Sequence, residues 1–238
     1  MNYLQIKSEN DKIFKENSYP EMQSEIVLNQ MILPMPAFSS KEPWFRVSEH
    51  LVCTDTITAV LKYGQGKTIA LNFANAMYPG GGYILGGNAQ EEALCRASLL
   101  YYTIRKMKAY YQMNRLHVLP DYTHAMIYSR NVPIIRDNSG KLLKSPKLCD
   151  FITCPAVNRT FAKFLFSQDN LDSVMLERIS LIMQLAVSKK PDTLIFGAFG
   201  CGVFGNKRET VYPQFEQAIN QYVPDNIKII FADPSAKQ

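Results

Sequence analysis

The chain has 238 residues, of which 47% are hydrophobic and 20% are charged, with a formal net charge of +5. This composition is typical of a globular protein and excludes a disordered chain, while the length suits one α/β domain with a large core. No apolar run reaches the roughly 18 residues of a transmembrane helix, and residues 1–7 lack a signal-peptide pattern, so we expect no membrane segment.

The cysteines indicate the cellular compartment, and the basic residues indicate which classes of partner are expected. Five scattered cysteines without a CxxC pair predict a reducing, cytoplasmic compartment, although delivery into another cell stays compatible with the sequence. They predict neither a disulfide framework nor a zinc site, and the three histidines show no metal-ligand spacing. The mild positive charge suits an anionic ligand. No basic cluster is dense enough for sequence-specific nucleic-acid binding, and we expect Lys141, Lys144 and Lys147 in a solvated loop.

Taken in chain order, the pattern starts with a segment that prolines interrupt. Residues 1–43 are predicted to be an N-terminal extension packed on the core, and residues 44–238 to form the catalytic domain. A short helix follows at 55–63 and ends at Gly64. Apolar runs predict strands at 68–74, 125–129, 148–154, 193–198 and 227–232. Helices are predicted at 89–112, 173–188 and 208–222.

Strands that alternate with helices predict an α/β fold. We expect a three-layer α/β/α sandwich around a largely parallel sheet. In such sheets, ligands bind at the carboxyl ends of the strands. The first glycine cluster lies there, because the strand at 68–74 leads to Asn75 and then to Gly80, Gly81 and Gly82. Three glycines leave bare backbone that can curl around a ligand.

Gln90, Glu91 and Glu92 follow the glycines where a helix is predicted to begin. A ligand beside the glycines would lie within reach of a carboxylate. Cleavage of a glycosidic bond needs a carboxylic acid beside the leaving oxygen. Adjacent helical side chains diverge by about 100°, so Glu91 and Glu92 are not expected to flank one sugar from opposite faces. Another anion, such as a diphosphate carried by the substrate, would then stabilise the cation.

Four blocks in this order resemble the poly(ADP-ribose) glycohydrolases of the macrodomain superfamily, in particular the compact bacterial type. The blocks are residues 71–82 with 90–92, 128–137, 151–158 and 197–204. The resemblance implies a mixed sheet, no cofactor and no metal. It implies Glu92 as general acid and then base, Glu91 orienting ribose hydroxyls, and Asn75 binding the distal ribose. Gly80, Gly81, Gly82 and Gln90 are further substrate-binding candidates.

A local explanation competes with the catalytic one. Asn88 could cap the helix with Glu91 as its N3 partner, because acidic residues in a first turn favour the helix dipole. This capping interpretation explains neither the bare glycines nor Asn75. A helix N-terminus also favours the charged form of a carboxyl group, whereas a general acid must hold a proton. Burial under bound substrate would have to outweigh that effect.

The second glycine cluster follows the strand at 193–198 and precedes a helix. A glycine turn between strand and helix makes an anion site from backbone N–H groups. By resemblance, this loop wraps the diphosphate and Phe204 packs on the distal ribose. The substrate-binding candidates here are Gly200, Cys201, Gly202, Val203, Phe204 and Gly205. The alternatives are a core aromatic at Phe204, a packed thiol at Cys201, and a dinucleotide fingerprint, for which the cluster lies too late in the chain.

The favoured function is a glycohydrolase that cleaves the ribose–ribose bond of poly(ADP-ribose) and releases ADP-ribose. Its partner is the polymer or an ADP-ribosylated macromolecule. Alternatives are a hydrolase that removes single ADP-ribose units, a non-catalytic ADP-ribose-binding macrodomain and, remotely, an NAD-dependent oxidoreductase. Apolar residues in the extension, Ile32, Leu33, Met35 and Phe38, suggest an ordered cap near the adenosine and thus cleavage from chain ends.

Overall fold

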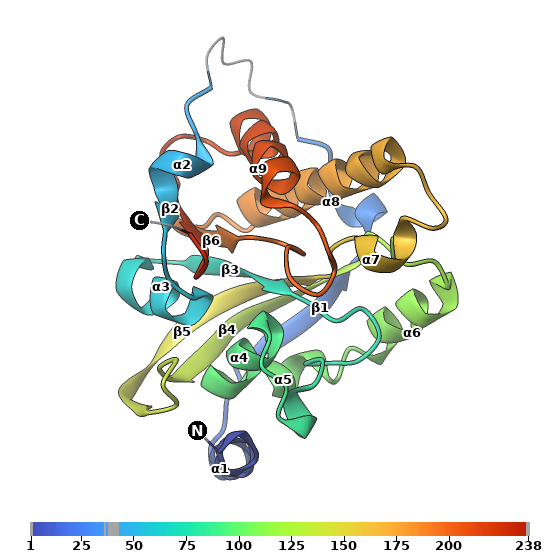
Figure 1. Ribbon diagram of the computed structural model, residues 1–238. Coiled ribbons are helices and arrows are strands. Elements are labelled where there is room, and N and C mark those ends of the chain that lie inside the picture. The colour runs from blue at the N-terminus through green and yellow to red at the C-terminus, as the bar shows by residue number, and fades with distance from the viewer. Residues whose placement is uncertain (1, 36, 38–42, 237–238) are drawn as a thin grey trace.

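A seven-stranded sheet forms the middle layer of the computed structural model, which describes residues 2–35, 37 and 43–236 (Figure 1). The strand order is β1-β4-β5-β3-β6-β7-β2. The strands are β1 (Gln23–Val27), β2 (Leu51–Val52), β3 (Thr68–Phe73), β4 (Met126–Arg136), β5 (Leu142–Cys154), β6 (Thr193–Gly197) and β7 (Lys228–Ala232). The hairpin β4–β5 and the pair β1–β4 are antiparallel, and the other neighbours are parallel.

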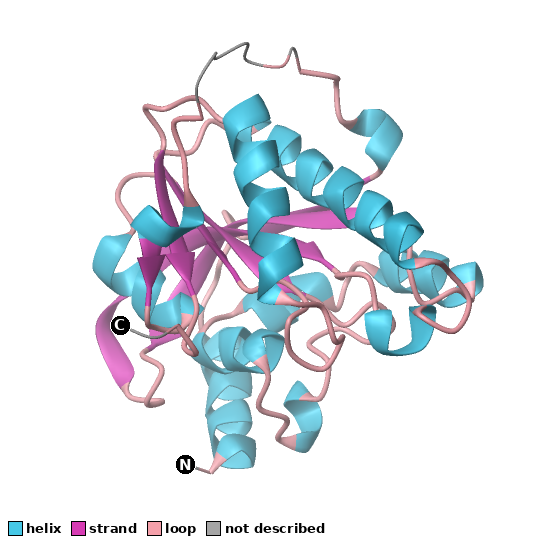
Figure 2. Cartoon of the chain, turned by 45° about the horizontal axis from the view of Figure 1, so that its top comes forward, coloured by secondary structure: helices cyan, strands magenta, loops and turns pink. Residues whose placement is uncertain are grey.

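Helices cover both faces of the sheet (Figure 2). One face carries α2 (Val47–His50), α7 (Arg159–Ala162), α8 (Gln168–Ser188) and α9 (Arg208–Tyr222). The other carries α1 (Tyr3–Glu16), α3 (Thr56–Tyr63), α4 (Gln90–Ala97), α5 (Leu100–Ile104) and α6 (Lys108–His117), with 3-10 turns η1 (Asn29–Met31) and η2 (Tyr83–Leu85) elsewhere in the chain. Ile69 and Leu71 of β3 enter the core under α8 and α9, whereas Ala70 enters the core under α3 and α4. This alternation along one buried strand confirms the three-layer α/β/α prediction with a mixed, largely parallel sheet.

The predicted long helix at 89–112 is wrong, because the chain breaks it to pair with the sheet. Ser98 adopts extended backbone and forms a bridge with Ile134 of β4. The Leu99 N–H donates to the Pro133 carbonyl at 3.0 Å. Tertiary pairing therefore overrides local helix propensity and leaves α4, α5 and α6 in place of one helix. None of the described helices is long and apolar enough to cross a membrane.

Of the three lysines that were expected in a loop, only Lys141 lies in one. Lys144 and Lys147 belong to β5, and Lys147 pairs with Ile134 of β4. The Lys147 ammonium donates to the Gly64 carbonyl at 2.8 Å. Helix α8 begins earlier than predicted, because the Ser167 hydroxyl caps it by accepting the Asn170 N–H. The short strands β1 and β2 have no prediction, since neither shows a clear alternating pattern.

The N-terminal segment supplies α1 and the edge strand β1, and it contacts α8. The Met35 N–H donates to Gln184 on α8, and the Phe45 N–H donates to Asn220 on α9. Ile32 is buried and Leu33 is 83% exposed, while Pro36 and Phe38 lie outside the described residues. The division of the chain at residue 43 stays a prediction.

Candidate active site

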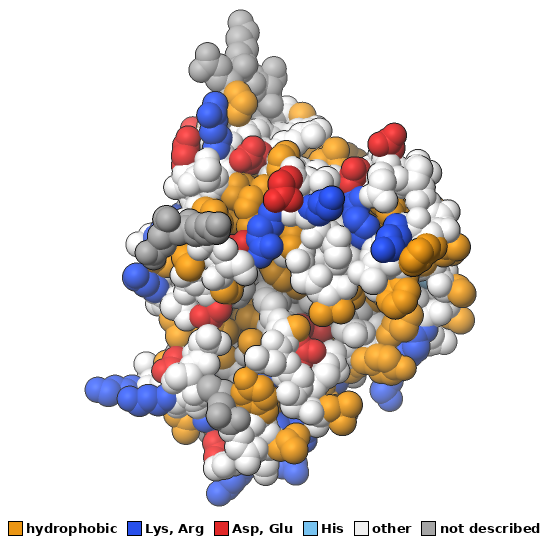
Figure 3. Space-filling model, in the orientation of Figure 1, with side chains coloured by type: hydrophobic (Ala, Val, Ile, Leu, Met, Phe, Trp, Pro, Cys, Tyr) orange, Lys and Arg blue, Asp and Glu red, His pale blue; other side chains and the backbone are white. Residues whose placement is uncertain are grey.

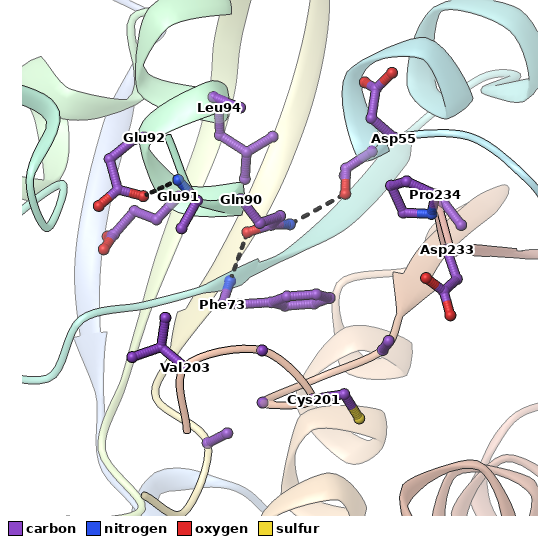
Figure 4. A pocket seen from close by; sticks show the side chains of 18 of the residues that line it. Asp55, Phe73, Gln90, Glu91, Glu92, Leu94, Cys201, Val203, Asp233 and Pro234 are labelled. Carbon is purple, nitrogen blue, oxygen red and sulfur yellow. Dashed lines mark hydrogen bonds between the residues drawn. The ribbon is translucent and has the colours of Figure 1, made fainter. Parts of the chain in front are cut away.

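A cavity of about 670 Å³ opens at the carboxyl ends of β3, β6 and β7 (Figure 4). Its volume lies within the range of small-molecule sites. The walls are the loop after β3, the first turn of α4, the β6–α9 loop, the start of α3 and the segment after β7. Figure 4 shows the two glutamates and Val203 at one end, and Asp55, Asp233 and Pro234 at the other. Parallel strands thus bring Asn75, the two glutamates and the second glycine cluster to one cavity.

Glu91 is only 2% exposed and is held from the β3 side. Its Oε1 accepts the Asn72 side-chain amide at 3.1 Å, and its Oε2 accepts the Asn75 N–H at 2.7 Å. Burial, with a smaller contribution from the nearby Glu92 carboxylate, raises the pKa of Glu91 to about 8, against the hydrogen bonds that favour the charged form. The site therefore retains a proton near neutral pH.

Glu92 is half-buried and is held from the glycine side. Its Oε1 accepts the Gly82 N–H at 2.8 Å, and its Oε2 accepts the Ala89 N–H at 3.1 Å. A Cβ on Gly81, where φ is +54°, would lie 2.6 Å from Glu92 Oε1 and 3.3 Å from Glu91 Oε2. The two carboxylates thus meet beside Gly81, although adjacent helical side chains begin in different directions.

The local capping interpretation assigns the wrong residues. Ala89 is the N-cap of α4, and its N–H is taken by Glu92, not Glu91. The Asn88 side chain instead accepts the Tyr3 hydroxyl of α1 at 3.1 Å and Arg96 Nη2 at 2.7 Å. The Arg96 guanidinium stacks 4.0 Å from the centre of the Tyr3 ring and also donates to the Gly87 carbonyl. Helix α1 therefore supports the loop that leads into the glutamates.

Gln90 and Asn75 line the cavity, but much of their hydrogen bonding is internal. The Gln90 amide accepts the Phe73 N–H at 2.9 Å and donates to Thr56 and to the Leu71 carbonyl, which fixes α4 against β3 and α3. Asn75 Oδ1 accepts the N–H groups of residues 77 and 78, both at 2.9 Å. Its amide nitrogen stays available to a ligand, whereas the amide of Gln90 is already engaged.

The triple glycine lies against the glutamates and is not among the cavity-lining residues. Gly80 and Gly81 adopt positive φ. A Cβ on Gly80 would lie 2.9 Å from the Tyr101 ring and 3.3 Å from the Cys95 sulfur. The observed role of this loop is to position carboxylates by close backbone approach. Direct binding of substrate by Gly80, Gly81 and Gly82 stays a prediction.

The β6–α9 loop faces the glutamates across the cavity. Among the described residues, no acceptor takes the N–H groups of Gly202, Val203 and Phe204, although the neighbouring Gly205 N–H is satisfied by the Gly202 carbonyl. Successive unpaired N–H groups form a concavity for an anion. Gly200 needs its glycine, because φ is +72° and a Cβ would lie 2.5 Å from Ala156. The loop is therefore shaped to receive a charged group.

Three residues of this loop differ in what they contribute. Phe204 lines the cavity and packs on Tyr122, with ring centres 5.9 Å apart. Burial raises the pKa of Cys201 to about 12, so its thiol stays protonated, as the packed-thiol alternative requires. A Cβ on Gly202 would meet nothing within 4 Å. Gly202 therefore needs no glycine for steric reasons in the free protein.

The far end of the cavity carries residues that sequence reasoning missed. Asp233 is buried and accepts Arg208 Nε at 2.5 Å, Arg208 Nη2 at 3.0 Å and the Tyr212 hydroxyl at 2.5 Å. Asn72, which holds Glu91, was also missed. A polar residue inside an otherwise apolar strand was the available signal for Asn72. The signal for Arg208 was a basic residue three positions after Gly205, where the next helix is predicted to begin.

No described part of the expected cap lies at the cavity. Among the described residues of the segment before 44, none lines it, and the part around Met35 packs on α8 instead. Chain-end cleavage therefore loses its sequence-based reason and stays a prediction. Over the described part of the chain, no group of three or more His, Cys, Asp or Glu side chains is placed to hold a metal ion.

Comparison with known proteins identifies the family to which this site belongs. A model of the family described as "Microbial-type PARG, catalytic domain" matches residues 5–137, more than half of the chain. PARG stands for poly(ADP-ribose) glycohydrolase. No curated protein sequence matches the chain significantly.

Solved structures agree with the family model. The poly(ADP-ribose) glycohydrolase from Thermomonospora curvata is 26% identical with a TM-score of 0.85, over 98% of this chain and 93% of that chain. Its complex with the inhibitor ADP-HPD is 25% identical with a TM-score of 0.83, over 99% and 94%. The enzyme from Deinococcus radiodurans in complex with ADP-ribose is 32% identical with a TM-score of 0.70, over 76% and 75%. The chain that carries this glutamate pair belongs to the microbial-type poly(ADP-ribose) glycohydrolase family.

Proposed function

We propose that this protein hydrolyses the ribose–ribose O-glycosidic bond of poly(ADP-ribose) and releases ADP-ribose. The observation that carries the proposal is the pair Glu91–Glu92, fixed by four hydrogen bonds at one end of a cavity whose opposite wall offers free N–H groups. A carboxyl group that can hold a proton and an anion site that can hold a diphosphate are the two parts that this reaction needs.

Glu92 is the proposed general acid. It donates a proton to the glycosidic oxygen as the bond from that oxygen to the ribose carbon breaks, which leaves an oxocarbenium-like sugar. Glu92, now a carboxylate, then takes a proton from the water that attacks the same carbon. The enzyme returns to its starting state, and the products are ADP-ribose and a chain shortened by one unit.

Glu91 is the proposed partner of Glu92 in the site. Its oxygens are engaged by Asn72 and Asn75, so its orientation is fixed, and its burial favours the protonated form. With its orientation fixed in this way, Glu91 is the proposed contact that orients the ribose hydroxyls beside Glu92. Asn75, through its free amide nitrogen, is the proposed contact to the distal ribose.

The β6–α9 loop is the proposed diphosphate site. The unpaired N–H groups of Gly202, Val203 and Phe204 support this role, and the Phe204 ring beside them offers a face to the ribose. The diphosphate would then lie across the cavity from the glutamates and stabilise the cationic sugar. Arg208 at the far end also lines the cavity, where it is paired with Asp233.

The test is release of ADP-ribose from purified polymer, measured by chromatography, together with ADP-ribose binding by calorimetry. We expect both turnover and binding. Binding without turnover would favour the non-catalytic reader, and turnover only on singly modified proteins would favour the mono-ADP-ribose hydrolase.

All five cysteines are free thiols, which supports the proposed reducing, cytoplasmic location.

A further inference from the structure

Hydrophobic side chains gather on the short helix α7 and the turn after it, beside the cavity mouth. We call Phe161, Lys163, Phe164 and Leu165 the α7 patch. Phe161 is 63% exposed and Phe164 is 76% exposed. The helix itself is anchored, because Ala162 is fully buried and the Phe166 side chain packs on the core. The aromatic rings therefore face solvent from a fixed element, and exposed apolar patches of this kind mark interaction sites.

The α7 patch is joined directly to the candidate active site. The Thr160 N–H donates to the Phe204 carbonyl at 3.2 Å, and the Thr160 hydroxyl donates to the Val203 carbonyl at 3.0 Å. Val203 is 83% exposed, lines the cavity and lies at the glutamate end in Figure 4. A molecule that leaves the cavity past Val203 thus meets α7 next.

Charge accompanies the aromatic rings. Lys163 Nζ lies 5.0 Å from the centre of the Phe164 ring, and Lys207 is exposed at the end of the β6–α9 loop. Across the described residues, neither lysine forms a salt bridge, whereas the neighbouring Arg159 is paired with Asp172. Figure 3 shows basic side chains in a row above the central hollow and hydrophobic ones at the right edge, where Figure 1 places α7 and α6.

We propose that the α7 patch binds the part of the poly(ADP-ribose) strand that lies beyond the scissile bond. This inference rests on the proposed function, because the bond to be broken lies at Glu92 and the remaining chain must leave on that side. The strand offers adenine rings and phosphates. Exposed aromatic rings stack on bases without sequence preference, and unpaired lysines attract the backbone phosphates. Phe161 and Phe164 take the adenine, and Lys163 takes a phosphate.

The experiment compares long polymer with free ADP-ribose as probes. Binding is measured in the Glu92→Gln background, so that cleavage does not interfere. The test variant adds Phe161→Ser with Phe164→Ser, and the matched control adds Leu33→Ser, an equally exposed apolar residue outside the patch. We expect the double substitution to weaken polymer binding about ten-fold, the value of one stacked base, with ADP-ribose binding equal to the control.

Lys163→Gln gives an independent electrostatic readout. The slope of log affinity against log salt should fall by about 0.7 for one lost phosphate contact to a single strand, whereas Lys12→Gln on α1 should leave it unchanged. Polymer affinity equal to the control in the double variant would overturn the proposal. An equal loss of ADP-ribose binding would also overturn it, since the cavity would then be damaged. A change in the oligomeric state of the double variant, measured by size exclusion, would also overturn the proposal, because it would assign the patch to contact with a second copy of the chain.

The experiment distinguishes failure of the proposed function from failure of the patch proposal. If the wild-type protein cleaves no polymer, the glycohydrolase proposal fails, while the two binding comparisons still report on the α7 patch. If the wild type cleaves polymer and the patch variants bind it as tightly as the controls, only the patch proposal fails.

Discussion

The Glu92 carboxylate accepts the Gly82 N–H at 2.8 Å, which couples the glycine loop to the proposed acid. The relation is local in space but spans ten residues of sequence. A Cβ on the preceding Gly81 would fall inside the contact distance of the same carboxylate. The conformation of three bare residues therefore determines where the proton donor lies.

Glu92→Gln should abolish most turnover. The amide keeps the size of the side chain but cannot donate a carboxylic proton, and general acid catalysis contributes about 10²–10⁴-fold. We expect that loss in kcat on polymer, with ADP-ribose binding retained by calorimetry. Glu16→Gln on the exposed end of α1 is the control and should behave as wild type. Near wild-type cleavage by Glu92→Gln would show that another residue is the acid.

Gly81→Ala and Gly202→Val should separate turnover from affinity. At Gly81 a Cβ displaces Glu92 Oε1, and a misplacement of about 1 Å can cost 10²-fold in rate, so kcat should fall more than ADP-ribose affinity. At Gly202 the space is open, so the added side chain leaves the fold intact and instead occupies room needed by the diphosphate. Calorimetry and steady-state kinetics on both variants check this, with thermal unfolding as the folding control. The reverse pattern would contradict both assignments.

The contribution of Glu91 to the stability of the protein should fall as pH rises from about 5 to about 8. The pKa of Glu91 is raised from 4.5 to about 8 in the folded protein, so folding favours the protonated form. The stabilisation that Glu91 contributes is fully present below its pKa in the unfolded chain. It is lost as pH rises through its pKa in the folded protein. Ionisation of Glu91 should therefore lower the wild-type melting temperature over this window, by about 2–4 °C for each kcal/mol lost.

Glu91→Gln is the matched variant for this titration. It should remove much of the decrease, because its amide does not ionise. The pKa values of Cys95 and Tyr111 beside it are raised by burial, so these groups keep their protons in the same window. Equal pH dependence of melting in the two proteins would show that Glu91 is not the titrating group.

Activity should persist in excess EDTA. The proposed reaction needs a proton donor and a water molecule, and Glu92 supplies the acid and base steps without a Lewis acid. ADP-ribose release with and without chelator is the measurement. Loss of activity that a divalent ion restores would assign a metal step to the mechanism.

Much of this fold was predictable from sequence because the parallel strands are buried on both faces. β3, β6 and β7 read as short apolar runs, and their boundaries agree with the structure within about two residues, as expected for such elements. The failures have a different origin. Ser98 leaves a good helical pattern to pair with Ile134, a partner far along the chain, and no local signal reports that contact.

The candidate active site likewise has a part that the sequence predicts and a part that depends on tertiary contacts. The motif placed Glu91, Glu92 and Asn75 at one strand end, and the structure brings them together. The motif could not show that Asn72 holds Glu91, or that Gly81 and Gly82 contact Glu92, because these depend on side-chain directions at the turn. The Arg208–Asp233 pair joins α9 to the end of β7 and likewise depends on tertiary packing.

The stacking of Tyr3 on Arg96 has a practical consequence for anyone who trims this protein. Helix α1 looks dispensable, since it lies outside the sheet and far in sequence from the glutamates. Yet Arg96 links it to Gly87 and Asn88, the residues that lead into α4. A shortened version that starts after α1 would keep every residue of the glutamate motif and still lose the helix that supports it. Screening of truncated forms should therefore score turnover and not only yield or solubility.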